Sequence, residues 1–129
     1  MARVLIVDDS EFITESLSDF LRSDGHEVVG VGFDGDEGLE KFRELRPDLT
    51  LLDITMPNRS GRDCLAKMLE LDPSARVLMV SAVKAASTVL DCLELGAAGY
   101  VEKPLRFSDP AFRSQLSETI GEALEHARP

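Results

Sequence analysis

Short apolar runs recur along the chain at fairly even spacing, and longer segments with a helical repeat separate them. The runs are Val4–Val7, Val28–Val31, Leu49–Leu52, Val77–Val80 and Tyr100–Val101. The first, third and fourth runs are nearly continuous in Val, Leu, Ile and Met, which is typical of strands covered on both faces in a parallel sheet. We therefore predict five strands at these positions.

The segments between the runs repeat apolar residues every three or four positions, which indicates amphipathic helices. The predicted helical stripes are Ile13, Leu17, Phe20 and Leu21; Leu39, Phe42 and Leu45; Leu65, Met68 and Leu69; Val89, Leu90 and Leu93; and Phe112, Leu116, Ile120 and Leu124. Helix-ending residues agree, since Gly25, Pro47 and Gly96 follow the first, second and fourth stripes. Asp109 and Pro110 predict the N-cap and the first helical position of the last helix.

Strand and helix thus alternate five times, which predicts an α/β fold of the (βα)₅ type. Right-handed crossovers make such a chain a doubly wound, five-stranded parallel sheet, and we expect the flavodoxin-like strand order 2-1-3-4-5. Residues 1–129 contain no linker, repeat or low-complexity tract, so we expect one domain. Ligands of such sheets bind beyond the carboxyl ends of the strands.

Composition narrows the classes of function. The net charge of −10 disfavours nucleic acid as a direct partner, because phosphates would be repelled. No apolar run approaches the roughly 20 residues of a membrane helix, and the N-terminus is no signal peptide. The two cysteines, Cys64 and Cys92, lie inside predicted helices without C-x-x-C spacing, so we expect buried free thiols, as suits a cytoplasmic protein.

Acidic residues follow the first and third strands, as Asp8, Asp9 and Asp53. In the order 2-1-3-4-5 these strands are neighbours, so the three carboxylates meet in one crevice. Two carboxylates ~4 Å apart repel by ~4 kcal/mol at an effective dielectric constant near 20, and the cluster must take up protons or hold a cation. Oxygen ligands without His or Cys favour a hard ion, and Mg²⁺ fits best.

The ends of the other strands suit phosphate chemistry. Lys103 offers a positive charge to a phosphoryl oxygen, and Ser81 offers a hydroxyl donor. Asp53 is a candidate nucleophile, since carboxylates form acyl phosphates. Each residue alone has an ordinary explanation, because an aspartate or Ser10 after a strand commonly caps the next helix. Their joint occurrence at four strand ends favours one reactive site.

With these residues, the chain resembles the receiver domain of two-component response regulators over essentially its whole length. The matching stretches are VLIVDDS (Val4–Ser10), LLDITMPNRSG (Leu51–Gly61), LMVSA (Leu78–Ala82) and GAAGYVEKP (Gly96–Pro104). The resemblance implies a stand-alone bacterial receiver of the chemotaxis or phosphorelay kind over residues 1–129, without an output domain. It implies a signalling protein, not an enzyme beyond its own phosphorylation and slow dephosphorylation.

The resemblance also implies a role for each site residue. Asp53 accepts the phosphoryl group from a sensor histidine kinase or a phosphotransfer protein, and Lys103 pairs with that group. Mg²⁺, for which Mn²⁺ can substitute, is bound directly by Asp9, Asp53 and the backbone carbonyl of Thr55. Asp8 binds the ion through water.

The same resemblance implies a conformational switch built on Ser81 and Tyr100. Ser81 hydrogen-bonds the phosphoryl group in the active state, and the Tyr100 ring turns inward behind it. The surface of the fourth helix, fifth strand and fifth helix then changes its affinity for a downstream protein. Thr55 and Val83 occupy the positions that flank the attacking water and tune the lifetime of the acyl phosphate. A monomer or a weak homodimer is expected.

A dinucleotide-binding domain is one alternative, because GVGFDG (Gly30–Gly35) fits the pattern G-x-G-x-x-G. Asp34, Asp36 and Glu37 would face the pyrophosphate where bare N–H groups are needed. We therefore interpret Asp34-Gly35 as a turn, with the acidic residues complementing the dipole of the following helix.

Two further alternatives concern the acidic site itself. A Mg²⁺-dependent phosphatase of the haloacid dehalogenase kind carries a second Asp two residues after its nucleophile, but Thr55 stands there after Asp53. A receiver-like binding module that takes no phosphate is disfavoured because every reactive position is filled.

Overall fold

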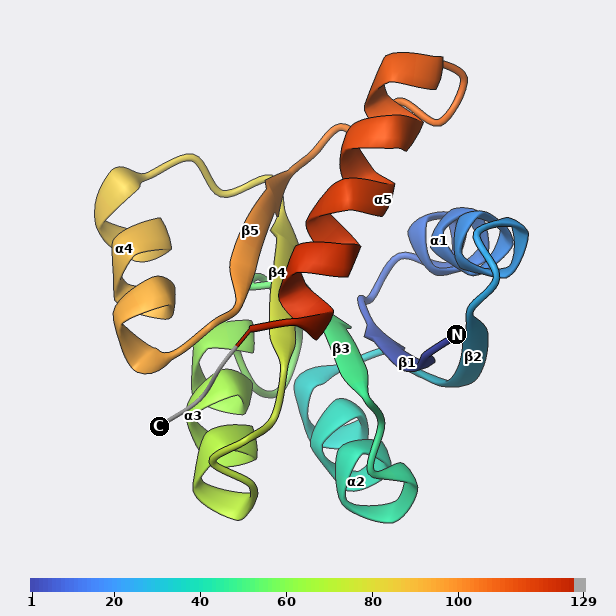
Figure 1. The fold of residues 1–129 in the computed structure, drawn as a ribbon. Coiled ribbons are helices and arrows are strands. Elements are labelled where there is room, and N and C mark those ends of the chain that lie inside the picture. The colour runs from blue at the N-terminus through green and yellow to red at the C-terminus, as the bar shows by residue number, and fades with distance from the viewer. Residues whose placement is uncertain (127–129) are drawn as a thin grey trace.

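The computed structural model describes residues 1–126 and contains the five strands and five helices that the apolar pattern predicts (Figure 1). In chain order they are β1 (Arg3–Val7), α1 (Glu11–Ser23), β2 (Glu27–Gly32), α2 (Gly35–Leu45), β3 (Leu49–Leu52), α3 (Gly61–Leu71), β4 (Val77–Ser81), α4 (Ala86–Leu95), β5 (Gly99–Glu102) and α5 (Pro110–Leu124). Within residues 1–126, no helix has both the length and the apolar character that crossing a membrane requires.

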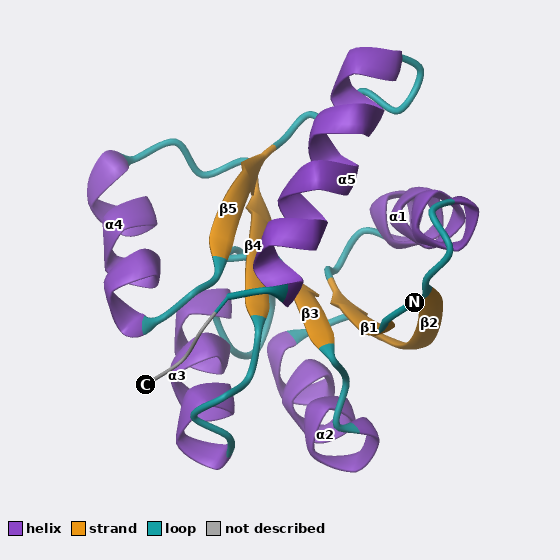
Figure 2. Ribbon diagram, viewed as in Figure 1, coloured by secondary structure: helices purple, strands orange, loops and turns teal. Residues whose placement is uncertain are grey.

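All neighbouring strands pair in parallel, and the sheet order is β2-β1-β3-β4-β5, which confirms the flavodoxin-like prediction. Figure 2 shows the strands as one layer between two layers of helices. Every residue of β3 and β4 is buried, as their continuous apolar runs indicate. The carboxyl ends of β1, β3, β4 and β5 therefore share one edge of the sheet.

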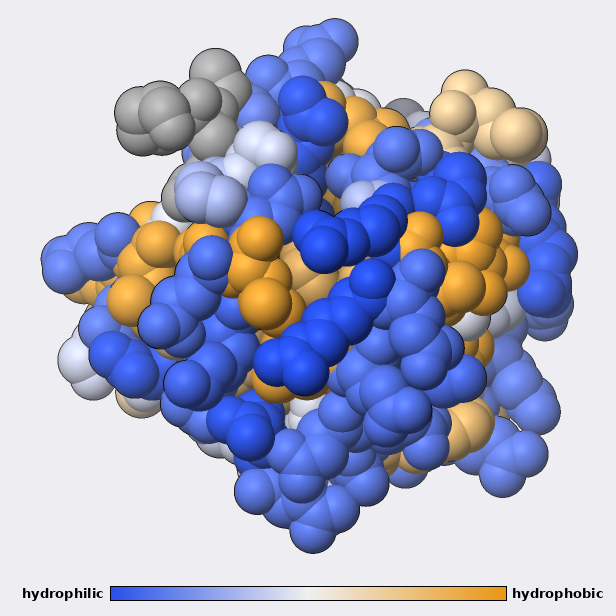
Figure 3. All heavy atoms as spheres, turned by 90° about the horizontal axis from the view of Figure 1, so that it is seen from below, coloured by the Kyte–Doolittle hydropathy of each residue, from blue (hydrophilic) through white to orange (hydrophobic). Residues whose placement is uncertain are grey.

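Alternate residues of the strands build two hydrophobic clusters, one on each face of the sheet. Val4 and Ile6 pack with residues of α1 and α5, whereas Leu5 and Val7 pack with residues of α2, α3 and α4. Cys64 and Cys92 are buried free thiols in the second cluster, as predicted. Outside this core, the face seen in Figure 3 is largely hydrophilic, with hydrophobic residues (orange) showing between hydrophilic ones (blue).

The buried face of α4 was predicted wrongly. The expected stripe includes Leu90 and Leu93, but these side chains are 56% and 40% exposed, and Cys92 is the buried residue of the helix. The reason is the position of α4 beside β5, an edge strand, where the helix covers only a narrow part of the sheet. The apolar residues on its outer side remain in solvent.

Side-chain caps fix where the helices begin. Ser10, and not an aspartate of the acidic pair, caps α1 by accepting a hydrogen bond from the Ile13 amide at 3.2 Å. Asp34 caps α2 by accepting from the Glu37 amide at 2.7 Å, and the Glu37 carboxylate accepts from the Phe33 amide. The N-terminus of α2 is therefore already satisfied by its own side chains, which supports the turn interpretation of the glycine segment over a dinucleotide site.

Candidate functional site

Asp8, Asp53 and Lys103 directly follow β1, β3 and β5, and neighbouring strands hold their backbones in place. The amide of Asp8 donates to the Gly32 carbonyl, and the amide of Asp53 donates to the Val7 carbonyl, each at 3.0 Å. The amide of Lys103 donates to the Ser81 carbonyl at the same distance. These bonds continue the parallel ladders past the last strand residues, so the side chains start from a rigid edge.

Three carboxylates converge at this edge. Asp8, Asp9 and Asp53 each place one carboxylate oxygen so that the three oxygens lie within 4.8 Å of one another. Asp8 is 2% exposed and Asp53 is 6% exposed, whereas Asp9 lies in solvent. The convergence that strand order alone predicts is therefore present.

Lys103 enters the same cluster. Its Nζ atom donates to Asp8 Oδ2 at 2.8 Å and to Asp53 Oδ2 at 3.3 Å. Burial disfavours the charged ammonium, but the hydrogen bond to Asp8 and the charge of Asp53 outweigh it and raise the pKa of Lys103. Lys103 is therefore held as a cation between the two buried carboxylates.

One ammonium does not balance three carboxylates. When all four groups are ionised, the cluster carries two negative charges in excess. Burial raises the pKa of Asp8, with the Asp53 charge adding to the shift and the Lys103 hydrogen bond opposing it. An oxygen-only donor set with this excess fits a hard divalent cation. The Thr55 carbonyl, on an exposed residue just after the cluster, stays a predicted fourth ligand.

Asp53 is held from both sides. Its Oδ1 accepts a hydrogen bond of 2.7 Å from the Ile54 amide, and its Oδ2 faces Lys103. The loop after Asp53 turns back so closely that a Cβ atom added to Gly61 would lie 1.8 Å from the Asp53 carbonyl oxygen. The glycine at the start of α3 is therefore part of the site, a role that its place in the motif LLDITMPNRSG does not by itself indicate.

Ser81 and Tyr100 meet at the loop between β4 and α4. Leu52 pairs with Met79 on the neighbouring strand, so Ser81 lies one residue beyond the position opposite Asp53. Ser81 Oγ accepts a hydrogen bond of 3.3 Å from the Val83 amide, and the Tyr100 hydroxyl donates to the Val83 carbonyl. Burial raises the pKa of Tyr100, while a hydrogen bond with Ser81 lowers it. The two predicted switch residues therefore share Val83 as a partner.

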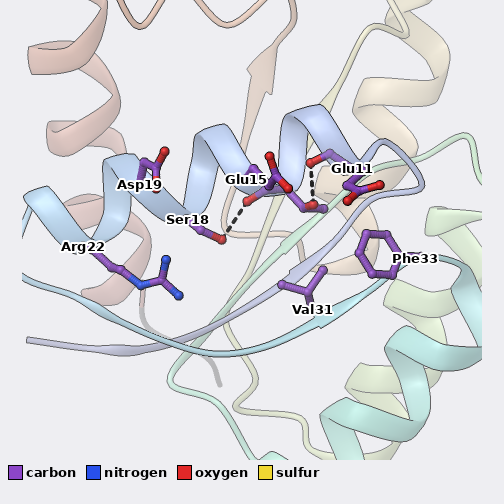
Figure 4. Close-up of a pocket in the computed structure, with 8 residues that line it drawn as sticks. Glu11, Glu15, Ser18, Asp19, Arg22, Val31 and Phe33 are labelled. Carbon is purple, nitrogen blue, oxygen red and sulfur yellow. Dashed lines mark hydrogen bonds between the residues drawn. The ribbon is translucent and has the colours of Figure 1, made fainter.

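A groove between α1 and β2 adjoins the glycine segment (Figure 4). It is lined by the acidic side chains Glu11, Glu15 and Asp19, together with Arg22, Val31 and Phe33, among others. The acidic lining would repel a pyrophosphate, which is a second reason to reject the dinucleotide alternative. The clustered carboxylates of Asp8, Asp9 and Asp53 are not among the residues that line this groove.

Comparisons with known proteins agree with this geometry. The family described as "Response regulator receiver domain" matches residues 4–111. The chemotaxis protein CheY of Treponema pallidum is 43% identical over 125 residues, covering 95% of this chain and 83% of that protein. The response regulator domain of Thermotoga maritima CheB is 36% identical with a TM-score of 0.85 and covers 97% of each chain. A chain of the CheX–CheY–BeF3–Mg²⁺ complex from Borrelia burgdorferi is 36% identical with a TM-score of 0.84, covering 92% of this chain and 85% of that one.

Proposed function

Because this chain belongs to the response regulator receiver family, we propose that it accepts a phosphoryl group on Asp53 from the phosphohistidine of a partner protein and signals to a downstream protein. The observation that supports this most directly is the placement of Asp53. Its carboxylate is buried beside two further carboxylates and within 3.3 Å of a lysine ammonium.

The reaction is a transfer between two nucleophiles. An oxygen of the Asp53 carboxylate attacks phosphorus, the P–N bond of the phosphohistidine breaks, and its electron pair leaves with the imidazole. Lys103 then transfers its weaker hydrogen bond from Asp53 to a phosphoryl oxygen while its 2.8 Å bond to Asp8 holds it in place. Hydrolysis of the acyl phosphate later regenerates the carboxylate.

Mg²⁺, bound by Asp9, Asp53 and the Thr55 carbonyl with Asp8 acting through water, would supply charge neutralisation for the phosphoryl oxygens. Mn²⁺ takes the same oxygen ligands. The chain's own contribution is the excess negative charge of the cluster, which attracts the ion, and the rigid strand ends, which keep the oxygens together without ordering cost at the moment of binding.

Phosphorylation would be read out through Ser81. If the Ser81 hydroxyl turns to the new phosphoryl group, the Val83 amide loses the oxygen that accepts its hydrogen bond. The loop before α4 must then rearrange, and with it the surface of α4, β5 and α5, where Leu90 and Leu93 stand exposed. This surface is the proposed contact for the downstream protein. The protein is proposed to act in the bacterial cytoplasm as a monomer or weak homodimer.

Intact-mass spectrometry after incubation with acetyl phosphate and MgCl₂ tests the proposal. We expect one added phosphoryl group in the wild type and in Asp19→Asn, a control on the exposed side of α1, and none in Asp53→Asn. A folded wild type that gains no mass would refute the proposal and favour a binding module that takes no phosphate. Continuous turnover of p-nitrophenyl phosphate would favour the phosphatase alternative instead.

A further inference from the structure

The loop that follows Asp53 is tied to the N-terminus of α2 by several polar contacts. Asn58 Nδ2 donates to Asp34 Oδ2 at 2.9 Å, and Arg59 Nε donates to Asp36 Oδ1 at 2.9 Å. The Gly35 amide also donates to the Pro57 carbonyl at 3.4 Å. We call the contacts of Asn58 and Arg59 with Asp34 and Asp36 the loop latch.

Arg59 is the centre of the loop latch. Its guanidinium lies between Asp36 of α2 and Asp63 of α3, and the side chain is 28% exposed. The hydrogen bond to Asp36 raises the pKa of Arg59 most, and the hydrogen bond to Asp63 raises it further. The two backbones also approach closely, because a Cβ atom added to Gly35 would lie 2.1 Å from the Arg59 carbonyl oxygen.

The residues between Asp53 and Arg59 are therefore anchored at both ends. At one end, the Ile54 amide donates to Asp53 Oδ1 at 2.7 Å, and the Ile54 carbonyl accepts from the Gly61 amide at 2.6 Å. At the other end, Pro57 and Arg59 meet α2. Thr55, whose carbonyl is the predicted metal ligand, lies between these two anchors.

We propose that Arg59 is a positioning residue for the metal site, acting through the loop latch on the path of residues 55–57. This inference rests on the proposed function, because that proposal places a divalent ion beside Asp53. Outer contacts that orient metal ligands commonly change metal affinity tenfold or more when they are lost.

The direction of the change in Mg²⁺ affinity distinguishes a positioning role of Arg59 from a purely electrostatic effect of its charge. Arg59 is a cation on the same side of the molecule as the acidic site, so losing its charge would leave Asp36 and Asp63 uncompensated and would strengthen attraction for a cation. Positioning predicts the opposite, namely weaker binding. Arg59→Lys isolates the geometry, because lysine keeps the charge but lacks the planar fork that joins two carboxylates.

Arg62→Lys is the matched control. Arg62 lies in the first turn of α3, three residues after Arg59, and pairs with Asp91 of α4, and its side chain is 48% exposed. Isothermal titration with MgCl₂ should show about tenfold weaker binding for Arg59→Lys than for wild type, and a change of less than about twofold for Arg62→Lys. The melting temperatures without metal should fall by similar small amounts in both variants, since in both an ammonium replaces the guanidinium of an exposed ion pair.

Equal Mg²⁺ affinity in Arg59→Lys and wild type, or tighter binding in Arg59→Lys, would overturn the inference. If Arg59→Lys does not fold, Asn58→Gly removes the bond to Asp34 and tolerates the left-handed backbone at this position (φ 69°). It is measured against the same control, with unchanged affinity again overturning the inference. Wild type that binds Mg²⁺ but gains no phosphoryl group from acetyl phosphate would refute only the proposed function. Wild type without measurable Mg²⁺ binding would refute both.

Discussion

Lys103 donates a hydrogen bond of 2.8 Å to Asp8 across 95 residues of sequence. This bond is shorter than the 3.3 Å bond from the same ammonium to Asp53, so Asp8 is the firmer partner. Burial nevertheless keeps the pKa of Asp8 raised. The lysine therefore compensates the acidic cluster only in part, and the ionised cluster opposes folding when no metal is bound.

Asp8→Asn is expected to stabilise the metal-free protein at pH 7. A raised folded-state pKa contributes stability that is complete below the unfolded value of 3.8 and is lost as the pH rises through the folded pKa. Removing the charge should raise stability on the order of 1 kcal/mol, or about 4 °C in Tm for a domain of this size. Thermal unfolding in EDTA at pH 7 and at acidic pH measures the gain, which should shrink as the pH falls.

Asp9 supplies the control, because Asp9→Asn also removes one charge of the cluster, but from an exposed carboxylate instead of a buried one. It should raise the Tm less than Asp8→Asn does. In excess Mg²⁺ the wild type should gain stability by binding, and Asp8→Asn should gain less. A lower Tm for Asp8→Asn in EDTA at pH 7 would contradict the interpretation of the cluster as under-compensated.

Lys103→Ala should separate metal binding from phosphoryl transfer. Loss of the ammonium leaves the three carboxylates with more negative charge, so Mg²⁺ binding should be unchanged or tighter. Phosphoryl uptake should fall by about tenfold to a hundredfold, because a charge-assisted hydrogen bond to the phosphoryl group is lost. Calorimetric titration gives the first quantity and a mass-spectrometric time course gives the second.

Lys84→Ala is the control for charge, since Lys84 pairs with Glu102 on the neighbouring surface. It should leave the uptake rate within about twofold of wild type, because exposed pairs contribute little. Weaker Mg²⁺ binding in Lys103→Ala would indicate that the lysine organises the metal ligands, and would count against the role proposed for it.

Much of this arrangement could be predicted from the sequence because strand order converts distant residues into neighbours. Apolar runs locate β1, β3 and β5, and the parallel topology then brings Asp8, Asp53 and Lys103 to one edge. The conclusion required no knowledge of loop conformation, since each of these residues directly follows a strand.

The features that escaped prediction depend on tertiary packing. Helical periodicity located α4 but not its buried face, because an edge position buries little of the helix and leaves Leu90 exposed. The bond between Arg59 and Asp36 depends on how the loop after β3 meets α2, which no local pattern of residues reports. Gly61 is similar, since its need for hydrogen in place of a side chain arises only from the approach of the Asp53 backbone.

Gly61→Ala and Gly121→Ala are expected to have opposite effects on stability. A Cβ atom at position 61 would meet the Asp53 carbonyl oxygen at 1.8 Å, so the loop must move. At position 121, in the exposed part of α5, a Cβ atom meets nothing within 4 Å. We expect Gly61→Ala to lose about 3 kcal/mol or more and Gly121→Ala to gain roughly 0.5–1 kcal/mol by its better helix propensity.

Urea unfolding of both variants measures these changes, and phosphoryl uptake from acetyl phosphate reports on the site. Even without urea, where Gly61→Ala is folded, this variant should take up the phosphoryl group more slowly than wild type, because Asp53 must shift with its backbone. Gly121→Ala should match the wild-type rate. Normal stability of Gly61→Ala would show that the loop relaxes at little cost, against the close approach described above.

Tyr100→Phe should loosen the loop before α4 without impairing the chemistry at Asp53. The Tyr100 hydroxyl donates to the Val83 carbonyl, while the Val83 amide donates to Ser81 Oγ, so one residue of the loop is held from both sides. Removing the hydroxyl leaves Val83 held only by the hydrogen bond from its amide to Ser81 Oγ. Since a net hydrogen bond contributes about 1 kcal/mol, local opening should become about fivefold more frequent.

Amide hydrogen exchange of the segment 82–85 measures this opening, with α2 as an internal reference whose exchange should not change. Phosphoryl uptake should stay within about twofold of wild type, because Lys103 donates its hydrogen bonds to Asp8 and Asp53 and does not depend on the Tyr100 hydroxyl. The phosphorylated and unphosphorylated forms of Tyr100→Phe should also differ less in exchange than those of wild type, since the tyrosine no longer couples Val83 to β5. An unchanged difference between the two forms would place the switch elsewhere than on the contact between Tyr100 and Val83.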